Sequence, residues 1–164
     1  MNRENTAGKR KPAKKFLRVF EYILASAAVL YIVFFLISLI IVNGYDSLKY
    51  RSGGWIVTEI TTIDLKSGSG HITSQSEAFG NRNFEADMTV SGKDLRRLKM
   101  KMAVYLVPFW LPEYSNPMIM DGDMWGFSFY SGGSEKSVKG YNAYPIGYRS
   151  ITRLLYGLED EAVR

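Results

Sequence analysis

Residues 22–42 read YILASAAVLYIVFFLISLIIV, a run of 21 residues without a charged residue, a proline or a glycine. As an α-helix this run would be about 32 Å long at ~1.5 Å per residue, which matches the ~30 Å hydrocarbon thickness of a bilayer. A helix also satisfies its own backbone groups, as a segment that crosses lipid must. A core helix that is apolar on every side is the alternative, and it is uncommon in a small domain. The run therefore predicts a membrane-spanning helix, along which lie Tyr22, Leu30, Phe34, Leu36 and Val42.

A cleaved signal peptide is the second interpretation of this run. The apolar part of such a peptide is typically ~7–15 residues long and ends at small residues before the cleavage site. Here the run is longer, its small residues lie at positions 25–28 near its beginning, and no Ala-x-Ala pattern follows Val42. These features favour an uncleaved signal anchor.

The charges that flank the run predict its orientation. Seven basic residues precede it, whereas only Lys49 and Arg51 follow soon after it. Because basic residues stay on the cytoplasmic side, we expect residues 1–21 to form a basic cytoplasmic tail and the rest of the chain to lie outside the plasma membrane. The tail would also suit anionic lipid headgroups, although orientation alone accounts for it.

The formal net charge of +5 does not indicate a nucleic-acid partner. The whole excess lies in residues 1–45, while residues 46–164 hold 14 basic and 14 acidic residues. A nucleic-acid-binding domain would carry its excess on the folded part. The chain has no cysteine and one histidine, which excludes disulfides, thiol catalysis and cysteine-based metal centres.

Residues 43–54, NGYDSLKYRSGG, predict a short linker that reaches about 40 Å when fully extended. The remaining residues, 55–164, show the patterns of strands and helices. The expected strands are residues 55–65, 71–78, 84–90, 118–120, 125–129 and 135–140, with a hairpin turn at Asp121-Gly122. One expected helix follows a capping box that starts at Ser91, and the other begins near Pro145. This order predicts an α+β domain, a small antiparallel sheet with two helices on one face.

The C-terminal part of the chain resembles a known group of domains. Residues 121–133 read DGDMWGFSFYSGG, residues 140–148 read GYNAYPIGY, and an apolar helix face follows at residues 151–158. This pattern is similar to small uncharacterised domains of Gram-positive bacteria that are often secreted or membrane-attached. The resemblance covers residues 117–158 and implies a bacterial source, a tryptophan-containing hairpin and a closing helix, but no activity.

The polar residues do not form a recognised catalytic or metal-binding motif. His71 lies among serines, yet no Gly-x-Ser-x-Gly motif presents a nucleophile. Asp121 and Asp123 lack the further ligands of a calcium loop. Glu85 and Asp87 share a strand face, which solvated alternation explains equally well. We therefore expect that the protein is not an enzyme and that it has no catalytic residue, metal or cofactor.

Two groups of residues are candidates for contacts with a partner. The first combines an aromatic, proline-containing loop with a basic helix and consists of Phe109, Trp110, Leu111, Tyr114, Arg96, Arg97 and Lys101. Such residues suit a membrane interface or an anchor on a partner. The second group, Tyr141, Asn142, Tyr144 and Tyr148, would border a small polar and aromatic pocket.

Two functions remain open at this point. The first is a non-enzymatic interaction module at the cell envelope, whose partners are the lipid bilayer and another envelope protein. The second is an extracytoplasmic domain that binds a small molecule or a peptide around residues 141–148.

Overall fold

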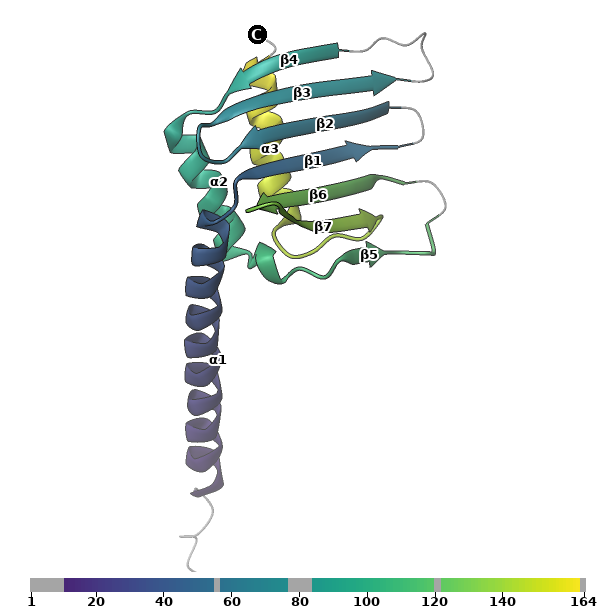
Figure 1. The fold of residues 1–164 in the computed structure, drawn as a ribbon. Helices are drawn as coiled ribbons and strands as arrows, with labels where there is room; N and C mark the ends of the chain where they lie inside the picture. The colour runs from purple at the N-terminus through teal and green to yellow at the C-terminus, as the bar shows by residue number, and fades with distance from the viewer. Residues whose placement is uncertain (1–10, 55–56, 77–83, 120–121, 163–164) are drawn as a thin grey trace, which may run out of the picture.

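A computed structural model describes residues 11–54, 57–76, 84–119 and 122–162 (Figure 1). In chain order the elements of these residues are α1 (Lys11–Asn43), β1 (Ser47–Gly53), β2 (Val57–Asp64), β3 (Ser69–Ser76), β4 (Phe84–Thr89), α2 (Gly92–Val104), the 3₁₀ turn η1 (Val107–Phe109), β5 (Glu113–Ser115), β6 (Met124–Ser131), β7 (Ser134–Tyr141) and α3 (Tyr148–Ala162). The α+β fold that the sequence predicts is confirmed.

Helix α1 is 33 residues long, or about 50 Å. Its part from Phe16 to Asn43 is long and apolar enough to cross a membrane, and it contains the predicted span at residues 22–42. Figure 1 shows most of α1 extending away from the rest of the protein. Large apolar side chains are exposed along this part, including Ile23 and Leu30.

The described strands form one seven-stranded sheet in the order β4-β3-β2-β1-β6-β7-β5. Neighbouring strands are antiparallel, except that β5 runs parallel to β7. The central strand is β1, which pairs with β2 on one side and β6 on the other. The prediction of a linker over residues 43–54 is therefore wrong, because most of this segment is the middle of the sheet. Only Leu48 and Tyr50 of β1 reach the core, so its apolar pattern is short.

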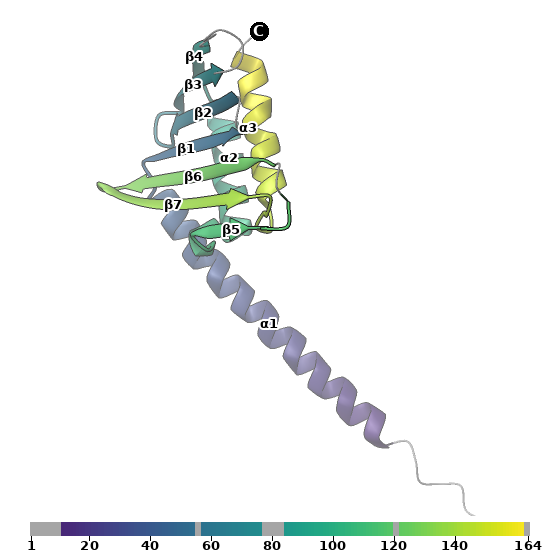
Figure 2. The same cartoon turned by 90° about the vertical axis from the view of Figure 1, so that its right-hand side faces the viewer.

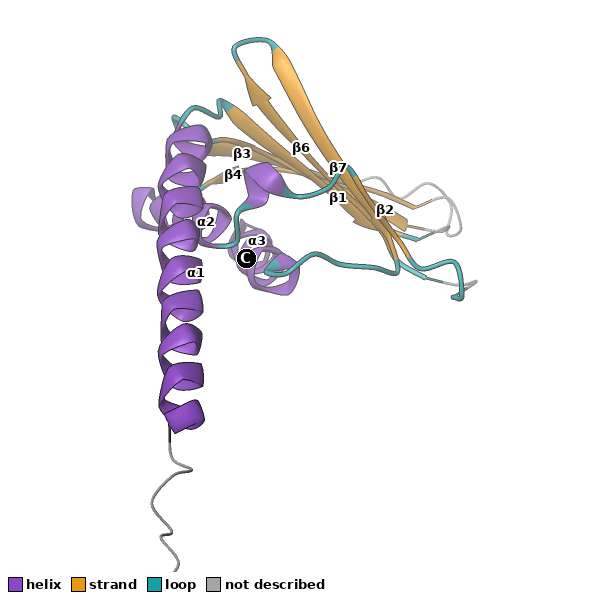
Figure 3. Ribbon diagram, turned by 90° about the horizontal axis from the view of Figure 1, so that it is seen from below, coloured by secondary structure: helices purple, strands orange, loops and turns teal. Residues whose placement is uncertain are grey.

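One face of the sheet is apolar and is covered by helices. Helices α2 and α3 lie on the same side of the sheet in both side views (Figures 1 and 2), and Figure 3 shows the same layers from below. The largest fully buried side chains between sheet and helices are Tyr50, Phe127, Phe129, Leu48, Ile63, Leu65, Ile72, Leu98, Met102, Ile151 and Leu155. No described helix covers the opposite face of the sheet, which we call the bare face.

Several predicted boundaries differ from the structure. The strand expected at residues 118–120 does not form in its described part, and the short strand β5 lies earlier in the chain. Asp121 of the expected hairpin turn lies outside the described residues, as do parts of the strands expected at residues 55–65 and 71–78. Helix α3 begins after Gly147, whose φ of +87° is a backbone conformation that favours glycine.

Candidate functional site

The end of α1 packs directly against the domain. Ser38 and Val42 are fully buried there. The Phe34 ring lies edge-on to the ring of Phe109, with 5.2 Å between the centroids. Closer to the N-terminus of α1, the Tyr31 hydroxyl donates a hydrogen bond of 2.9 Å to the carbonyl oxygen of Val104. The domain thus packs directly on about the last three and a half turns of α1, without an intervening linker.

The loop around η1 is held by polar contacts from the sheet. The Lys136 ammonium group donates to the carbonyl oxygens of Pro108 and Trp110. The indole nitrogen of Trp110 donates to the carbonyl oxygen of Tyr105 at 3.1 Å. Burial lowers the pKa of Lys136, because loss of water disfavours the charged ammonium group. The loop is therefore fixed to the core.

This arrangement divides the predicted aromatic surface into two parts. Trp110 is 8% exposed and packs against Phe127 at 6.0 Å between the ring centroids, so its prediction as a surface contact is wrong. Tyr114 is half-buried against Trp125. Phe109 and Leu111 remain exposed, and Phe109 lies against Phe34 of α1.

Two basic residues of α2, Arg97 and Lys101, line a groove between α2 and α3. Arg96 and Arg97 are exposed, as the sequence predicts. Lys101 lies at the base of the groove and donates hydrogen bonds to the carbonyl oxygen of Ser150, at 3.0 Å, and to its hydroxyl. The groove has a volume of about 300 Å³ and includes Arg153 of α3.

The four residues of the predicted aromatic pocket lie in different surroundings. Asn142 has a φ of +51° and forms a turn, in which its side chain accepts from the Asp123 backbone amide at 3.1 Å. Tyr144 and Tyr148 pack against each other with ring centroids 4.7 Å apart. Tyr141 lines a hollow on the bare face instead.

On the face of the sheet that the helices cover, the hydroxyl groups of three tyrosines form hydrogen bonds. The Tyr50 hydroxyl lies 3.0 Å from the hydroxyl groups of both Tyr148 and Tyr156. Burial and these partners raise the pKa of Tyr50 far above its usual range, so the group stays protonated. The cluster joins the central strand β1 to α3, so Tyr148 has a structural role in this contact.

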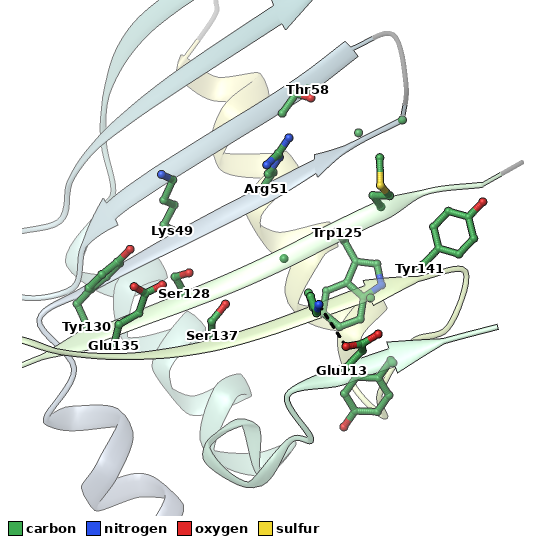
Figure 4. Close-up of a pocket in the computed structure, with 17 residues that line it drawn as sticks. Lys49, Arg51, Thr58, Glu113, Trp125, Ser128, Tyr130, Glu135, Ser137 and Tyr141 are labelled. Carbon is green, nitrogen blue, oxygen red and sulfur yellow. Dashed lines mark ion pairs between the residues drawn. The ribbon is translucent and has the colours of Figure 1, made fainter. Parts of the chain in front are cut away.

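The sequence did not predict the hollow on the bare face (Figure 4). It has a volume of about 640 Å³. The residues that line it are Lys49, Arg51, Gly53, Gly54, Thr58, Glu113, Tyr114, Met124, Trp125, Gly126, Ser128, Tyr130, Glu135, Ser137, Lys139, Gly140 and Tyr141. The predicted linker over residues 43–54 assigns Lys49 and Arg51 to neither face of a sheet. Their alternation with Leu48 and Tyr50 was the available signal.

Basic side chains line this hollow. Arg51 lies opposite Gly126 in the register of β1 and β6, and Gly126 lies opposite Lys139 in the register of β6 and β7. Lys139 pairs with Glu113 at 3.2 Å. Arg51 and Lys49 form no ion pair with the residues that the structure describes. Because Glu113 and Glu135 also line the hollow, its charge is mixed, and Lys49 and Arg51 are the groups that could receive an acidic group of a polar ligand.

The structure brings two of the polar residues considered above, His71 and Asp87, together at the surface. His71 lies 2.9 Å from the carboxylate of Asp87, across the β3–β4 pair, and Asp87 is almost fully exposed. The described residues contain no group of three potential metal-ligating His, Cys, Asp or Glu side chains. Glu159 of α3 is a buried acidic residue. Burial raises the pKa of its carboxyl group to about 7, and the Thr61 hydroxyl donates a hydrogen bond to it.

Comparison with known proteins leaves the function to be inferred from this geometry. No family model and no curated protein matches the chain. The resemblance of residues 117–158 to domains of Gram-positive bacteria accordingly stays a prediction. Three surfaces remain for a partner: the exposed part of the η1 loop, the groove between α2 and α3, and the hollow on the bare face.

Proposed function

We propose that the chain is a single-pass protein of the plasma membrane, with a cytoplasmic N-terminus and a non-enzymatic interaction module outside. The seven basic residues before the span support this orientation. The proposed partners are the lipid bilayer and another envelope protein.

The observation that carries this proposal is the direction in which α1 leaves the domain. Figure 2 shows that α1 departs on the side of the sheet where α2 and α3 lie. A bilayer crossed by α1 would therefore lie on the helix side of the domain. The bare face would look away from the lipid and would be open to a partner.

The exposed residues at the junction fit the same placement. Ile40 is 73% exposed, so the free side of α1 is still apolar near Val42, as expected of a span that ends there. Phe34 lies eight residues before Val42, or about 12 Å along the helix. Phe109, which contacts Phe34, and its neighbour Leu111 would then enter the outer leaflet, where aromatic and apolar residues are stable.

A second candidate function is the binding of a small molecule or a peptide. The hollow of about 640 Å³ on the bare face favours it, since this volume lies in the range of ligand sites. The site proposed here includes Tyr141, but not the other three residues of the predicted aromatic pocket.

The absence of cysteine from the chain makes the orientation directly testable. Single cysteines can be placed at Ala13 in the tail and at Ser134 in the β6–β7 hairpin, and intact cells can be treated with a membrane-impermeant maleimide. We expect S134C to be labelled in intact cells and A13C only after lysis. The reverse pattern would overturn the proposed orientation.

The interaction role can be tested in the same membranes. A photo-reactive residue in place of Ser137, in the hollow, should form an adduct of discrete mass with a partner. The same replacement in a Gly126→Trp background should not form it, because the indole would fill the hollow. Equal adducts in both backgrounds, or none in either, would count against binding at the bare face.

A further inference from the structure

The domain is neutral overall, but its charges are separated. Helix α2 and the first seven residues of α3 together carry seven basic residues and one acidic residue. The basic residues are Lys93, Arg96, Arg97, Lys99, Lys101, Arg149 and Arg153. The rest of residues 46–164 carries seven basic and 13 acidic residues. These two segments, on the side where α1 leaves, therefore have a net charge of +6, and the acidic end of α3 (Glu159, Asp160 and Glu161) reduces the charge of α2 and α3 together to +3.

Three of these basic residues meet in the groove between α2 and α3. Arg97 and Lys101 come from α2, and Arg153 comes from α3. Neither arginine forms an ion pair within the described part of the chain. The one carboxylate of the groove, Asp94, accepts a hydrogen bond of 2.6 Å from the Ser91 hydroxyl and offsets one of the three positive charges. The groove thus holds uncompensated positive charge.

The distances along the helices place this charge close to the outer end of the span. Val104, which accepts the Tyr31 hydroxyl, lies seven residues after Arg97, or about 10 Å along α2. Tyr31 lies 11 residues before Val42, or about 16 Å along α1. Figure 1 shows α2 ending beside α1 and beginning beyond its end. Arg97, which lies nearer than Val104 to the outer end of the span, would accordingly approach the depth at which the headgroups begin.

We propose that the groove between α2 and α3 binds the phosphate headgroup of an anionic phospholipid. The guanidinium groups of Arg97 and Arg153 offer paired N–H donors that match phosphate oxygens. Lys101, which Ser150 holds in place, adds a third positive charge at the base. Leu154, beside them in the groove, provides apolar surface for the glycerol and the first methylene groups. This site rests on the proposed membrane anchoring and names the lipid that the anchored domain would select.

The test uses the full chain in lipid nanodiscs and in detergent. Native mass spectrometry of the solubilised chain measures how much phosphatidylglycerol it retains over phosphatidylcholine after reconstitution in an equal mixture. The test variant is Arg97→Gln/Arg153→Gln. The control is Lys66→Gln/Lys139→Gln, which removes the same charge from outside the groove. A basic residue near an anionic surface contributes about fivefold in affinity, so the preference should fall about 25-fold in the test variant and stay unchanged in the control.

Each outcome bears on one of the two proposals. An equal fall in both variants would show a diffuse charge effect and overturn the groove site. An unchanged preference in the test variant would overturn it as well, while carbonate-resistant membrane association of the same variant would leave the anchoring intact. Binding of soluble polyglutamate without any preference for phosphatidylglycerol would indicate an acidic partner in place of the lipid. Release of the wild-type chain by carbonate would contradict the anchoring itself.

Discussion

Phe34 of the apolar helix and Phe109 of the η1 loop form an edge-to-face aromatic pair, 5.2 Å apart between ring centroids. The two residues are 75 positions apart in the chain. Their contact joins the candidate membrane span to the domain. It fixes the direction of α1 relative to the sheet, on which the proposed placement of the bare face depends.

A double-mutant cycle should detect this pair as a coupling energy. Phe34→Ala and Phe109→Ala should each destabilise the domain, and together they should cost less than the sum of the single effects by about 0.5–1.5 kcal/mol. Urea unfolding of the full chain in micelles, followed by tryptophan fluorescence, measures this. Leu111→Ala combined with Phe34→Ala is the control and should be additive. A coupling of zero for the aromatic pair would contradict the contact.

Two glycines on opposite faces of the sheet should respond differently to alanine. A β-carbon at Gly140 would lie 2.1 Å from the Trp125 ring, which is buried in the core. At Gly126 the nearest atom would be 3.7 Å away, because this position opens into the hollow. We expect Gly140→Ala to lose about 1–3 kcal/mol and Gly126→Ala to change stability by less than about 1 kcal/mol. Thermal unfolding of both variants compares them, and equal losses would contradict the assigned faces.

Glu159 should make the domain less stable as pH rises. Burial, the largest cause, together with the charges of Glu59 and Asp160, raises the pKa of its carboxyl group from the ordinary 4.5 to about 7, although the hydrogen bond from Thr61 lowers it. The folded state thus holds the proton more tightly than the unfolded chain. The resulting stabilisation, roughly 3 kcal/mol at most, is complete below about pH 4.5 and is lost as pH rises through 7.

Glu159→Gln isolates this effect, since its amide can still accept from the Thr61 hydroxyl. The free energy of unfolding of the wild type should fall relative to that of the variant between about pH 5 and 8. The measurement is urea unfolding at several pH values in this interval. Parallel curves for the two proteins would mean that the carboxyl group is not buried in the folded state.

Lys136 should hold the η1 loop through its ammonium group. Lys136→Met keeps the length of the side chain but removes the donor to the Pro108 and Trp110 carbonyl oxygens. We expect a loss of about 1–3 kcal/mol and faster amide hydrogen exchange in residues 106–111. Lys139→Met, on the other face of the same strand, is the control. Unchanged exchange in the loop would contradict the assigned bonds.

The periodic segments were predictable, while the long-range contacts were not. The alternation of Trp125, Phe127 and Phe129 and the apolar stripe of α2 identify core elements, because each pattern is complete within its own segment. By contrast, β1 shows only Leu48 and Tyr50 as core residues, among serine, lysine, arginine and glycine. Its central position depends on pairing with β6, more than 70 residues later.

The candidate surfaces were likewise predictable only where a local pattern defines them. The basic character of α2 was visible from the sequence, but the groove needs Arg153 from α3. Phe109 and Trp110 are adjacent and both aromatic, yet one is exposed and the other is buried. Their difference is set by Phe127 and Lys136, which no local pattern connects to them.

The position of β1 has a consequence for biogenesis. If the anchor enters the membrane first, β1 is the earliest strand to emerge on the far side, only a few residues behind it. β2 can join it at once, but β6 arrives only after α2 and η1 have been translocated. The middle of the sheet therefore keeps one open edge during export, and closure of the fold awaits the last third of the polypeptide.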